Sequence, residues 1–398
     1  MGLAVGAGRE QLAAIAAAQA QGFRVLALDG DPEAPGLHLA DRAEVVDLRD
    51  ADTVTRVARL HGVGFTLPVP IGRLLTTQAA VHEAMGLRGV RMACAEVCTD
   101  KQRFHEAMSA AGVAVPWQRE LPSVQHLRAI EPASLAFPLV LKPRYGSGSR
   151  GVLVVAGTYE WHDAVAQAQD EAPAEGWVLQ SLVDGVPLGV DGAVIRGRAR
   201  IVLVREKLMS PWPHRVELVY RAPADIPDVA TARLEELLGR ALTTVQANDC
   251  LFHADAILRP DGQPVLIELS ARPSGLRIAA ELVPACTGVD LLGQGLRLHQ
   301  HGHADFAPRR AWPTVLHYWH HPGGIVQEVP DAAALRQLPN VNGAEVGWMP
   351  GQTVCGPASV AELLPAGHLL VSAPTWNEVE STLCRALSLF EVKPNEGT

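Results

Sequence analysis

Two carboxylates lie at mirror-related positions of one predicted β-hairpin, and this arrangement constrains the chain more than any other feature. Residues 252–275 read FHADAILRPDGQPVLIELSARPSG. Asp261-Gly262 is typical of a two-residue hairpin turn, in which both positions need a positive φ. Counting outward from that turn pairs Asp255 with Glu268. Like charges directly opposite each other on a sheet are destabilising, so the pairing favours a cation between them.

Two more polar residues extend this candidate site. Because side chains alternate between the two faces of a strand, Ser270 and Arg272 lie on the same face as Glu268 if the strand reaches them. The segment therefore predicts a site of hard oxygen ligands beside an arginine, which suits Mg²⁺ and phosphate. The alternative is a solvated hairpin face that carries unrelated charges.

A glycine-rich loop follows Lys142. Residues 137–155 read FPLVLKPRYGSGSRGVLVV, with Gly146, Gly148 and Gly151 in a G-x-G-x-x-G pattern. In a dinucleotide-binding fold or a P-loop such a segment leads into a helix, whereas here it joins two β-branched runs. The arrangement predicts a strand–loop–strand lid whose backbone N–H groups and serine hydroxyls bind phosphates, with Lys142 placed to meet their charge. The alternative is a flexible hairpin tip that binds nothing.

Taken together, these motifs resemble the ATP-grasp superfamily over nearly the whole chain. Residues 99–116 (TDKQRFHEAMSAAGVAVP) look like the family's opening motif, whose lysine binds ATP phosphates, and residues 177–185 (WVLQSLVDG) look like its adenine-reading strand. The resemblance implies ATP and one or two Mg²⁺ ions as cofactors. It assigns the nucleotide to Lys101, Lys142, Ser147, Gly148, Ser149, Gln180, Val183 and Asp184, and the metal to Asp255, Glu268 and Ser270.

The sequence is most similar to the carboxylate–amine ligase branch, which includes the bacterial L-amino acid (dipeptide) ligases. Residues 210–224 (SPWPHRVELVYRAPA) look like a stretch of that branch in which a histidine faces the acyl phosphate. The resemblance implies catalytic roles for His214 and for Arg272, which would face the phosphate. Arg277 and Arg215 are candidates for binding a substrate carboxylate. The alternatives are a loop histidine without a ligand and a surface arginine.

Three residues depart from the family pattern. Ser270 stands where the family usually has asparagine, so a hydroxyl replaces an amide carbonyl as a metal ligand. Asp255 stands where the family usually has the longer glutamate. Pro187 aligns with the family's ribose-binding glutamate and cannot bond a hydroxyl, so Asp184 or Asp191 would have to take that role.

The composition excludes several classes of protein. The chain has 398 residues, of which 48% are hydrophobic and 19% charged, so we expect two or three globular domains. Its formal net charge of -9 argues against a nucleic-acid partner. It has no apolar run of membrane-spanning length and no evident signal peptide, and its six cysteines are scattered. We therefore expect a cytoplasmic protein with reduced thiols and no membrane partner, and a homodimer is left open.

The predicted fold class combines α/β and α+β layers. The resemblance implies an ATP-grasp fold, with a Rossmann-like preliminary domain at residues 1–98, two ATP-grasp lobes at 99–303 and a small C-terminal domain at 304–398. Helices are expected near residues 229–246 and 376–389.

The N-terminal region reads as alternating strands and helices, which predicts a parallel α/β layer. Gly6 and Gly8, followed by Asp29 at a strand end, also permit a dinucleotide-binding interpretation. Gln11 stands where the third glycine of that motif would be. The expected elements are a short strand and turn at residues 3–8, strands at 23–29 and 63–69, and a helix at 9–21.

The expected function is that of an ADP-forming carboxylate–amine ligase acting on small-molecule carboxylate and amine substrates. Two alternatives stay open. One is an ATP-grasp enzyme of purine biosynthesis that activates bicarbonate or formate. The other is a nucleotide-binding module that has lost turnover, which the departures at Pro187 and Ser270 motivate.

Overall fold

The computed structural model describes residues 1–171 and 176–394, which form two compact units. The long strands β9 (Val186–Ile195) and β10 (Arg198–Met209) each contribute residues to both units. The expected boundaries at residues 98 and 303 remain a prediction. Unit 1 comprises Met1–Val115, Gly189–Val204 and Ile226–Arg309, and unit 2 comprises Pro116–Leu188, Arg205–Asp225 and Arg310–Thr398.

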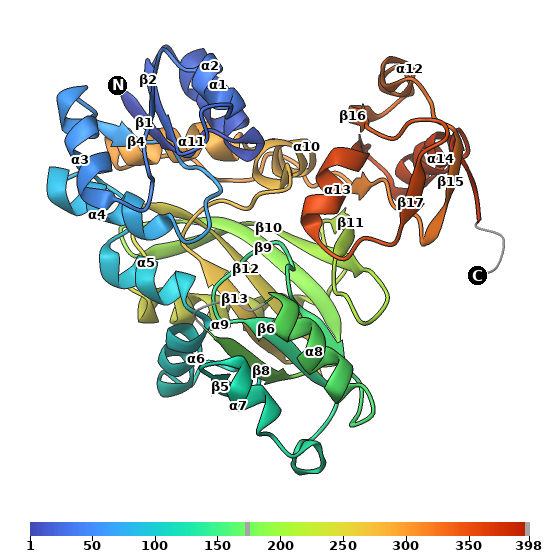
Figure 1. Cartoon of the computed structure of the whole chain (residues 1–398). Helices are drawn as coiled ribbons and strands as arrows, with labels where there is room; N and C mark the ends of the chain where they lie inside the picture. The colour runs from blue at the N-terminus through green and yellow to red at the C-terminus, as the bar shows by residue number, and fades with distance from the viewer. Residues whose placement is uncertain (172–175, 395–398) are drawn as a thin grey trace. The chain divides into compact units, whose positions relative to one another are not determined.

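The N-terminal part of unit 1 is the predicted parallel α/β layer. Its sheet has the order β3-β2-β1-β4, and every pairing in it is parallel. Figure 1 shows this sheet in blue with α1 and α2 beside it. The expected strand at residues 63–69 is only the two residues Phe65–Thr66, because Pro68 and Pro70 lack the N–H that a sheet ladder needs. The elements are β1 (Gly2–Val5), β2 (Val25–Asp29), β3 (Arg42–Val45), β4 (Phe65–Thr66), a 3-10 turn (Arg9–Gln11), α1 (Leu12–Ala20), α2 (Pro35–Leu39), α3 (Ala51–Leu60) and α4 (Leu75–Met85).

Side chains occupy the glycine turn after β1. The N–H of Ala7 donates to Oδ2 of Asp29 at 2.6 Å, so this carboxylate binds its own chain. Gln11 Nε2 donates to the carbonyl of Pro70, and its side chain lies 3.2 Å from where a Cβ on Gly8 would be. The Gln11 side chain therefore occupies the space beside the turn that a glycine at position 11 would leave open. This disfavours the dinucleotide interpretation.

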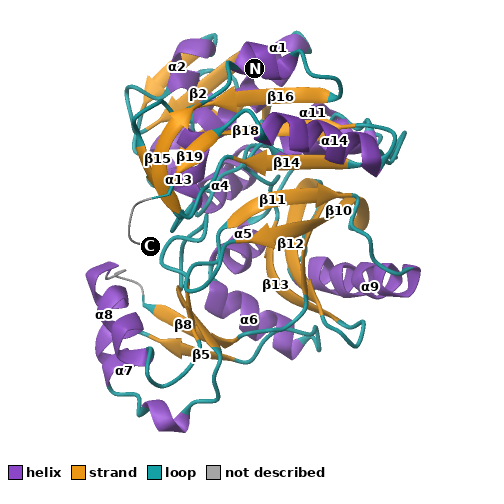
Figure 2. Ribbon diagram, turned by 90° about the vertical axis from the view of Figure 1, so that its right-hand side faces the viewer, coloured by secondary structure: helices purple, strands orange, loops and turns teal. Residues whose placement is uncertain are grey.

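The rest of unit 1 is built around the predicted hairpin. Helix α9 packs against β13, as does α5, and Figure 2 shows α9 beside β12 and β13. The expected helix near residues 229–246 is confirmed. The elements are α5 (Met92–Thr99), α6 (Lys101–Ala110), α9 (Asp228–Thr244), β12 (Cys250–Leu258), β13 (Pro264–Ser270), a π-helix (Ile278–Leu282), α10 (Val283–Thr287) and α11 (Leu291–His301).

Unit 2 contains an antiparallel sheet of order β5-β8-β6-β7, whose apolar core includes Trp161 and Trp177. A second set of strands has the order β11-β14-β18-β16, and the expected C-terminal helix is α14. The elements are β5 (Gln118–Leu121), α7 (Val124–Arg128), a 3-10 turn (Pro132–Ser134), β6 (Leu139–Pro143), β7 (Leu153–Val155), α8 (Trp161–Glu171), β8 (Trp177–Ser181), β11 (Glu217–Ala222), β14 (Thr314–Tyr318), β15 (Gly323–Glu328), α12 (Ala332–Arg336), β16 (Val341–Val346), β17 (Thr353–Cys355), α13 (Val360–Ala366), β18 (Gly367–Ser372), α14 (Trp376–Leu387) and β19 (Glu391–Lys393).

A buried histidine network joins α4 to the N-terminal sheet. His82 Nδ1 lies 2.9 Å from the carbonyl of Val90, so this nitrogen carries the ring proton and donates it. His82 Nε2 then accepts from the hydroxyl of Thr66 at 2.7 Å, and Gln78 donates to the same hydroxyl. A second proton on the ring would face an oxygen that already accepts a hydrogen bond. Burial of the ring, together with the charge of the neighbouring His299, lowers the pKa of His82 to about 3.

The network makes the free energy of unfolding depend on pH. The unfolded chain takes up a proton on His82 near pH 6.5, whereas the folded chain does so near pH 3. The stability contributed by neutral His82 is therefore present above pH 6.5 and is lost as the pH falls towards 3, by about 1 kcal/mol per pH unit. Urea unfolding between pH 7 and 5 should show a shallower dependence for His82→Gln. The matched variant at an exposed histidine, His38→Gln, should keep the wild-type slope, and an unchanged slope in His82→Gln would contradict the assignment.

Candidate active site

The predicted pairing of the two carboxylates is confirmed, although the predicted turn is wrong. Asp255 on β12 lies opposite Glu268 on β13. The turn spans residues 259–262, because the N–H of Gly262 donates to the carbonyl of Arg259 at 2.8 Å. Gly262 has a φ of +74°, and Asp261 is not among the residues with positive φ. Because Arg259 also pairs with Gln263, the loop between the strands has three residues, 260–262, and ends in a left-handed glycine. This loop replaces the expected two-residue turn.

A β-bulge restores the register that the longer turn displaces. Next to the turn Leu258 pairs with Pro264, one residue away from the predicted partner. The register then shifts between Ala256 and Asp255, and Ile267 is the extra residue. Because a bulge places two residues opposite one, it turns the following side chains to the other face. Glu268 consequently shares a face with Asp255.

Two cationic side chains lie within electrostatic reach of this pair. Burial lowers the pKa of the Lys101 amino group, and the Glu268 carboxylate acts in the opposite direction. Burial likewise lowers the pKa of Arg272, and Glu268 and Asp255 oppose the shift. Glu268 thus acts on both cations and Asp255 acts on Arg272, and the nearby carboxylates of Asp100 and Glu10 act in the same direction.

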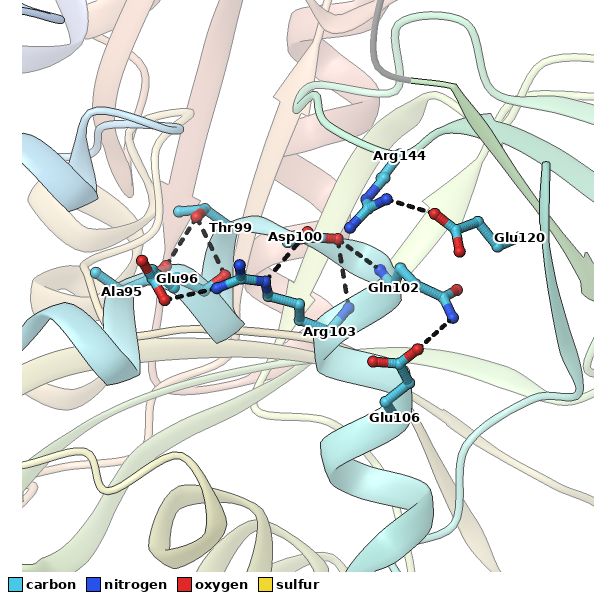
Figure 3. Close-up of polar contacts among 9 residues, drawn as sticks. All are labelled: Ala95, Glu96, Thr99, Asp100, Gln102, Arg103, Glu106, Glu120 and Arg144. Atoms are coloured by element: carbon cyan, nitrogen blue, oxygen red, sulfur yellow. Dashed lines mark hydrogen bonds and ion pairs between the residues drawn. The ribbon is translucent and has the colours of Figure 1, made fainter. Parts of the chain in front are cut away.

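Lys101 is held in place by the start of α6. The Asp100 carboxylate caps this helix by accepting from the N–H of Gln102 at 2.9 Å and from that of Arg103 at 3.3 Å. Arg103 also pairs with Glu96, as Figure 3 shows. Asp100 is almost fully buried, so the cap fixes the first residue of the helix, which is Lys101.

The segment after β13 brings together residues that sequence reasoning separated or missed. Ser270 is buried and pairs with His253, and Arg277 forms an ion pair with Glu281 at 2.6 Å. Glu10, which was not predicted, accepts from the N–H of Leu276 at 2.5 Å. Leu276 and Arg277 have φ values of +53° and +58°, which are uncommon for residues with side chains. Glu10 is far from this segment in the sequence and carries no motif of its own.

The residues of this hairpin in unit 1 fit a hard cation. The two opposed carboxylates supply hard oxygen ligands, and the Ser270 hydroxyl adds a third oxygen from the same strand. Within residues 1–171 and 176–394, no three His, Cys, Asp or Glu side chains come together as a metal-binding group. A Mg²⁺ ion here would thus need phosphate or water oxygens to complete its shell, which is the usual mode for this metal.

The predicted strand–loop–strand arrangement is confirmed in unit 2, and its role as a phosphate lid stays a prediction. Lys142 is buried on β6, which pairs antiparallel with β7 across the glycine-rich loop. In the loop, Gly146, Gly148 and Gly151 all have positive φ, as does Ser149 at +57°. The glycines are therefore used for the left-handed backbone that side chains disfavour.

The lid is hydrogen-bonded to the loop that carries His214 and Arg215. The hydroxyl of Ser149 donates to the carbonyl of Arg215 at 3.0 Å, and the N–H of Val154 donates to the carbonyl of Pro213 at 2.9 Å. Burial lowers the pKa of Arg215. Two candidate segments about 60 residues apart in the sequence thus lie side by side within unit 2.

The expected nucleotide-reading residues lie on β8 and directly after it. Gln180 is buried and its amide donates to Oε1 of Gln118 at 2.6 Å, while Val183 is half-buried and Asp184 is exposed. Nearby on β5, Glu120 pairs with Arg144 (Figure 3). Asp191 is fully buried and accepts from the Ser274 hydroxyl, so of the two aspartates expected to contact ribose only Asp184 is accessible.

Two global expectations are also addressed by the structure. All six cysteines are free thiols, as expected, although Cys94 and Cys98 approach to 4.0 Å between sulfur atoms. Among the helices that the structure describes, none has both the length and the hydropathy needed to cross a bilayer.

Comparison with protein families and curated proteins supports these observations. Residues 135–280 match the family model for the ATP-grasp domain. The chain is 24% identical over 246 residues to an alanine–anticapsin ligase of Bacillus subtilis, which covers 56% of this chain and 51% of that protein. It is 31% identical over 162 residues to a formate-dependent phosphoribosylglycinamide formyltransferase of Parasynechococcus marenigrum, which covers 39% and 41%. The chain thus spans about half or less of the length of these two relatives.

Solved structures share the fold over the full length. An L-amino acid ligase from Bacillus licheniformis superposes with a TM-score of 0.82 at 20% identity and covers 99% of both chains. At this identity the match establishes the fold alone. Residues 135–280 thus match the ATP-grasp domain, the fold is shared with an L-amino acid ligase, and the relatives that the chain resembles include an alanine–anticapsin ligase and a D-alanine–D-alanine ligase.

Proposed function

We propose that the protein is an ATP-dependent, ADP-forming ligase that joins a carboxylate to an amine through an acyl phosphate. The observation that carries the proposal is the Asp255–Glu268 pair with Lys101 and Arg272 in electrostatic reach. Carboxylates that face each other favour a bound cation, and buried cations favour anionic oxygens. The combination suits the Mg²⁺ complex of a nucleoside triphosphate.

Each expected residue takes one role in the proposed reaction. Bound Mg²⁺ would neutralise charge on the phosphate oxygens, and Asp255, Glu268 and Ser270 would hold it. Lys101 and Lys142 would bind phosphates, and the lid would cover them. The lid residues are Ser147, Gly148 and Ser149, and the adenosine contacts are Gln180, Val183 and Asp184.

The chemistry requires an activated acyl group. Oxide is a poor leaving group, so the carboxylate must first attack the terminal phosphate, and the amine then displaces phosphate through a tetrahedral intermediate. Arg272 would neutralise the acyl phosphate, and His214 would donate a hydrogen bond to the developing oxyanion. Arg215 and Arg277 would bind substrate carboxylates and orient them, which by itself lowers the barrier.

The nature of the two substrates is the second part of the proposal. The match to an alanine–anticapsin ligase and the L-amino acid ligase fold support small amino-acid-like substrates. The match to a formyltransferase supports the alternative of a purine-type enzyme that activates formate or bicarbonate. A matrix of amino acid pairs, assayed for phosphate release with MgATP, tests the first. Formate with glycinamide ribonucleotide and bicarbonate with aminoimidazole ribonucleotide test the alternative, and release in neither set would favour a module without turnover.

Glu268→Gln should abolish turnover while the fold survives. The neutral amide cannot balance the metal charge, and its introduction removes a repulsion opposite Asp255. We expect kcat to fall at least about 1,000-fold, in line with the loss of transition-state charge stabilisation. Glu235→Gln, at an exposed glutamate on α9, is the matched control and should keep wild-type turnover. Wild-type-like turnover in Glu268→Gln would refute the metal assignment.

Nucleotide should order the lid. Amide hydrogen exchange of residues 146–151 should slow when MgAMP-PNP binds, because the backbone N–H groups then donate to phosphate oxygens. The turn at Arg196-Gly197 is the internal control, since it lies outside the proposed site and should exchange at one rate in both states. Equal protection of the lid with and without nucleotide would count against its role.

A further inference from the structure

A buried ion pair closes the base of the loop that carries His214 and Arg215. Lys207, near the end of β10, and Glu217, at the start of β11, flank residues 210–216, and Nζ of Lys207 lies 2.5 Å from Oε1 of Glu217. Their side chains are 5% and 18% exposed. The second oxygen of Glu217 accepts from the hydroxyl of Tyr220 at 2.7 Å. Both carboxylate oxygens are therefore committed to residues of the same hairpin.

A β-bulge makes this arrangement possible. In β11, Glu217 and Tyr220 are three residues apart, which in a regular strand would place them on opposite faces. The register shifts between Leu208 and Met209, so that Met209 pairs with Glu217 while Lys207 pairs with Tyr220. The extra residue turns Glu217 to the face that Lys207 and Tyr220 share.

Ser210 fixes the loop from within. Its N–H donates to the carbonyl of Val216 at 2.7 Å, and its hydroxyl accepts from the N–H of Val216 at 3.0 Å. The same hydroxyl donates to the carbonyl of His214 at 3.0 Å. One buried serine thus holds both the end of the loop and the backbone of the candidate catalytic histidine.

Such an ion pair is a poor means of gaining stability. Removing two charges from water costs about as much as their attraction returns, and apolar residues of similar size often replace a buried pair without loss of stability. The pair instead imposes one geometry, because both partners must be satisfied. This geometry constrains residues 210–216. In that segment the carbonyls of Pro213 and Arg215 accept hydrogen bonds from the N–H of Val154 and the hydroxyl of Ser149.

We propose that Lys207 and Glu217 are positioning residues, which hold the His214–Arg215 loop in the place where it meets the phosphate lid. The inference rests on the proposed function, because that function assigns His214 to the acyl phosphate and Arg215 to the substrate. The pair flanks the loop and is hydrogen-bonded to the neighbouring Tyr220, and it acts on the reaction through His214 and Arg215.

Glu217→Gln tests the proposal, because it removes the charge and keeps the shape. Amide exchange of Ser210, Val216 and Val154, whose N–H groups are hydrogen-bonded within or to the loop, should accelerate about tenfold or more. With the most active substrate pair of the matrix, kcat should fall about 10–100-fold, since a small misplacement of a catalytic group has effects of this size. The KM for ATP should change less than about threefold, because the nucleotide contacts lie elsewhere.

Two further variants separate positioning from folding. Glu380→Gln makes the same substitution in an exposed ion pair with Arg221, 3.6 Å apart, and should change neither loop exchange nor kcat. Lys207→Met combined with Glu217→Gln should be no worse than Glu217→Gln alone, because the two residues act as one unit. Unaltered loop exchange in Glu217→Gln would overturn the proposal. A loss of activity that is no larger than the loss of folded protein in this variant would overturn it as well. The exchange measurement needs no turnover, so an inactive wild type would refute the proposed function and leave this test intact.

Discussion

Two carboxylates held opposite each other on an antiparallel ladder set the requirement that the surrounding structure meets. Asp255 and Glu268 repel each other unless positive charge lies close by. Lys101, fixed by the Asp100 cap, and Arg272, beyond the end of β13, supply that charge within the same unit. A metal–phosphate complex bound here would pair its metal with the two carboxylates and its phosphate oxygens with Lys101 and Arg272.

Two bulges set the positions of the functional side chains in the two units. The bulge at Ile267 brings Glu268 to the face of Asp255, and the bulge at Leu218 brings Glu217 to the face of Lys207. In each case a single extra residue reverses which face of the strand a carboxylate occupies. The candidate site in each unit therefore depends on a local break in the period-2 pattern.

The same bulges mark the limit of what the sequence could predict. Strict alternation and a two-residue turn gave the correct Asp255–Glu268 pairing only because the longer turn and the bulge shift the register in opposite directions. The lid was predictable because β-branched runs flank its glycines. Glu10 and the bond from Ser149 to Arg215 were not, because both join segments that are distant in sequence and carry no pattern. The roles of the site residues remain predictions.

The transfer of oxygen from substrate to phosphate tests the central claim most directly. If the carboxylate attacks the terminal phosphate of ATP, one ¹⁸O atom from a carboxylate-labelled substrate must appear in the released phosphate, together with ADP and the amide product. Mass spectrometry of the phosphate reads this out. Label in AMP would show an adenylating mechanism, and amide formation without any label transfer would contradict the acyl phosphate altogether.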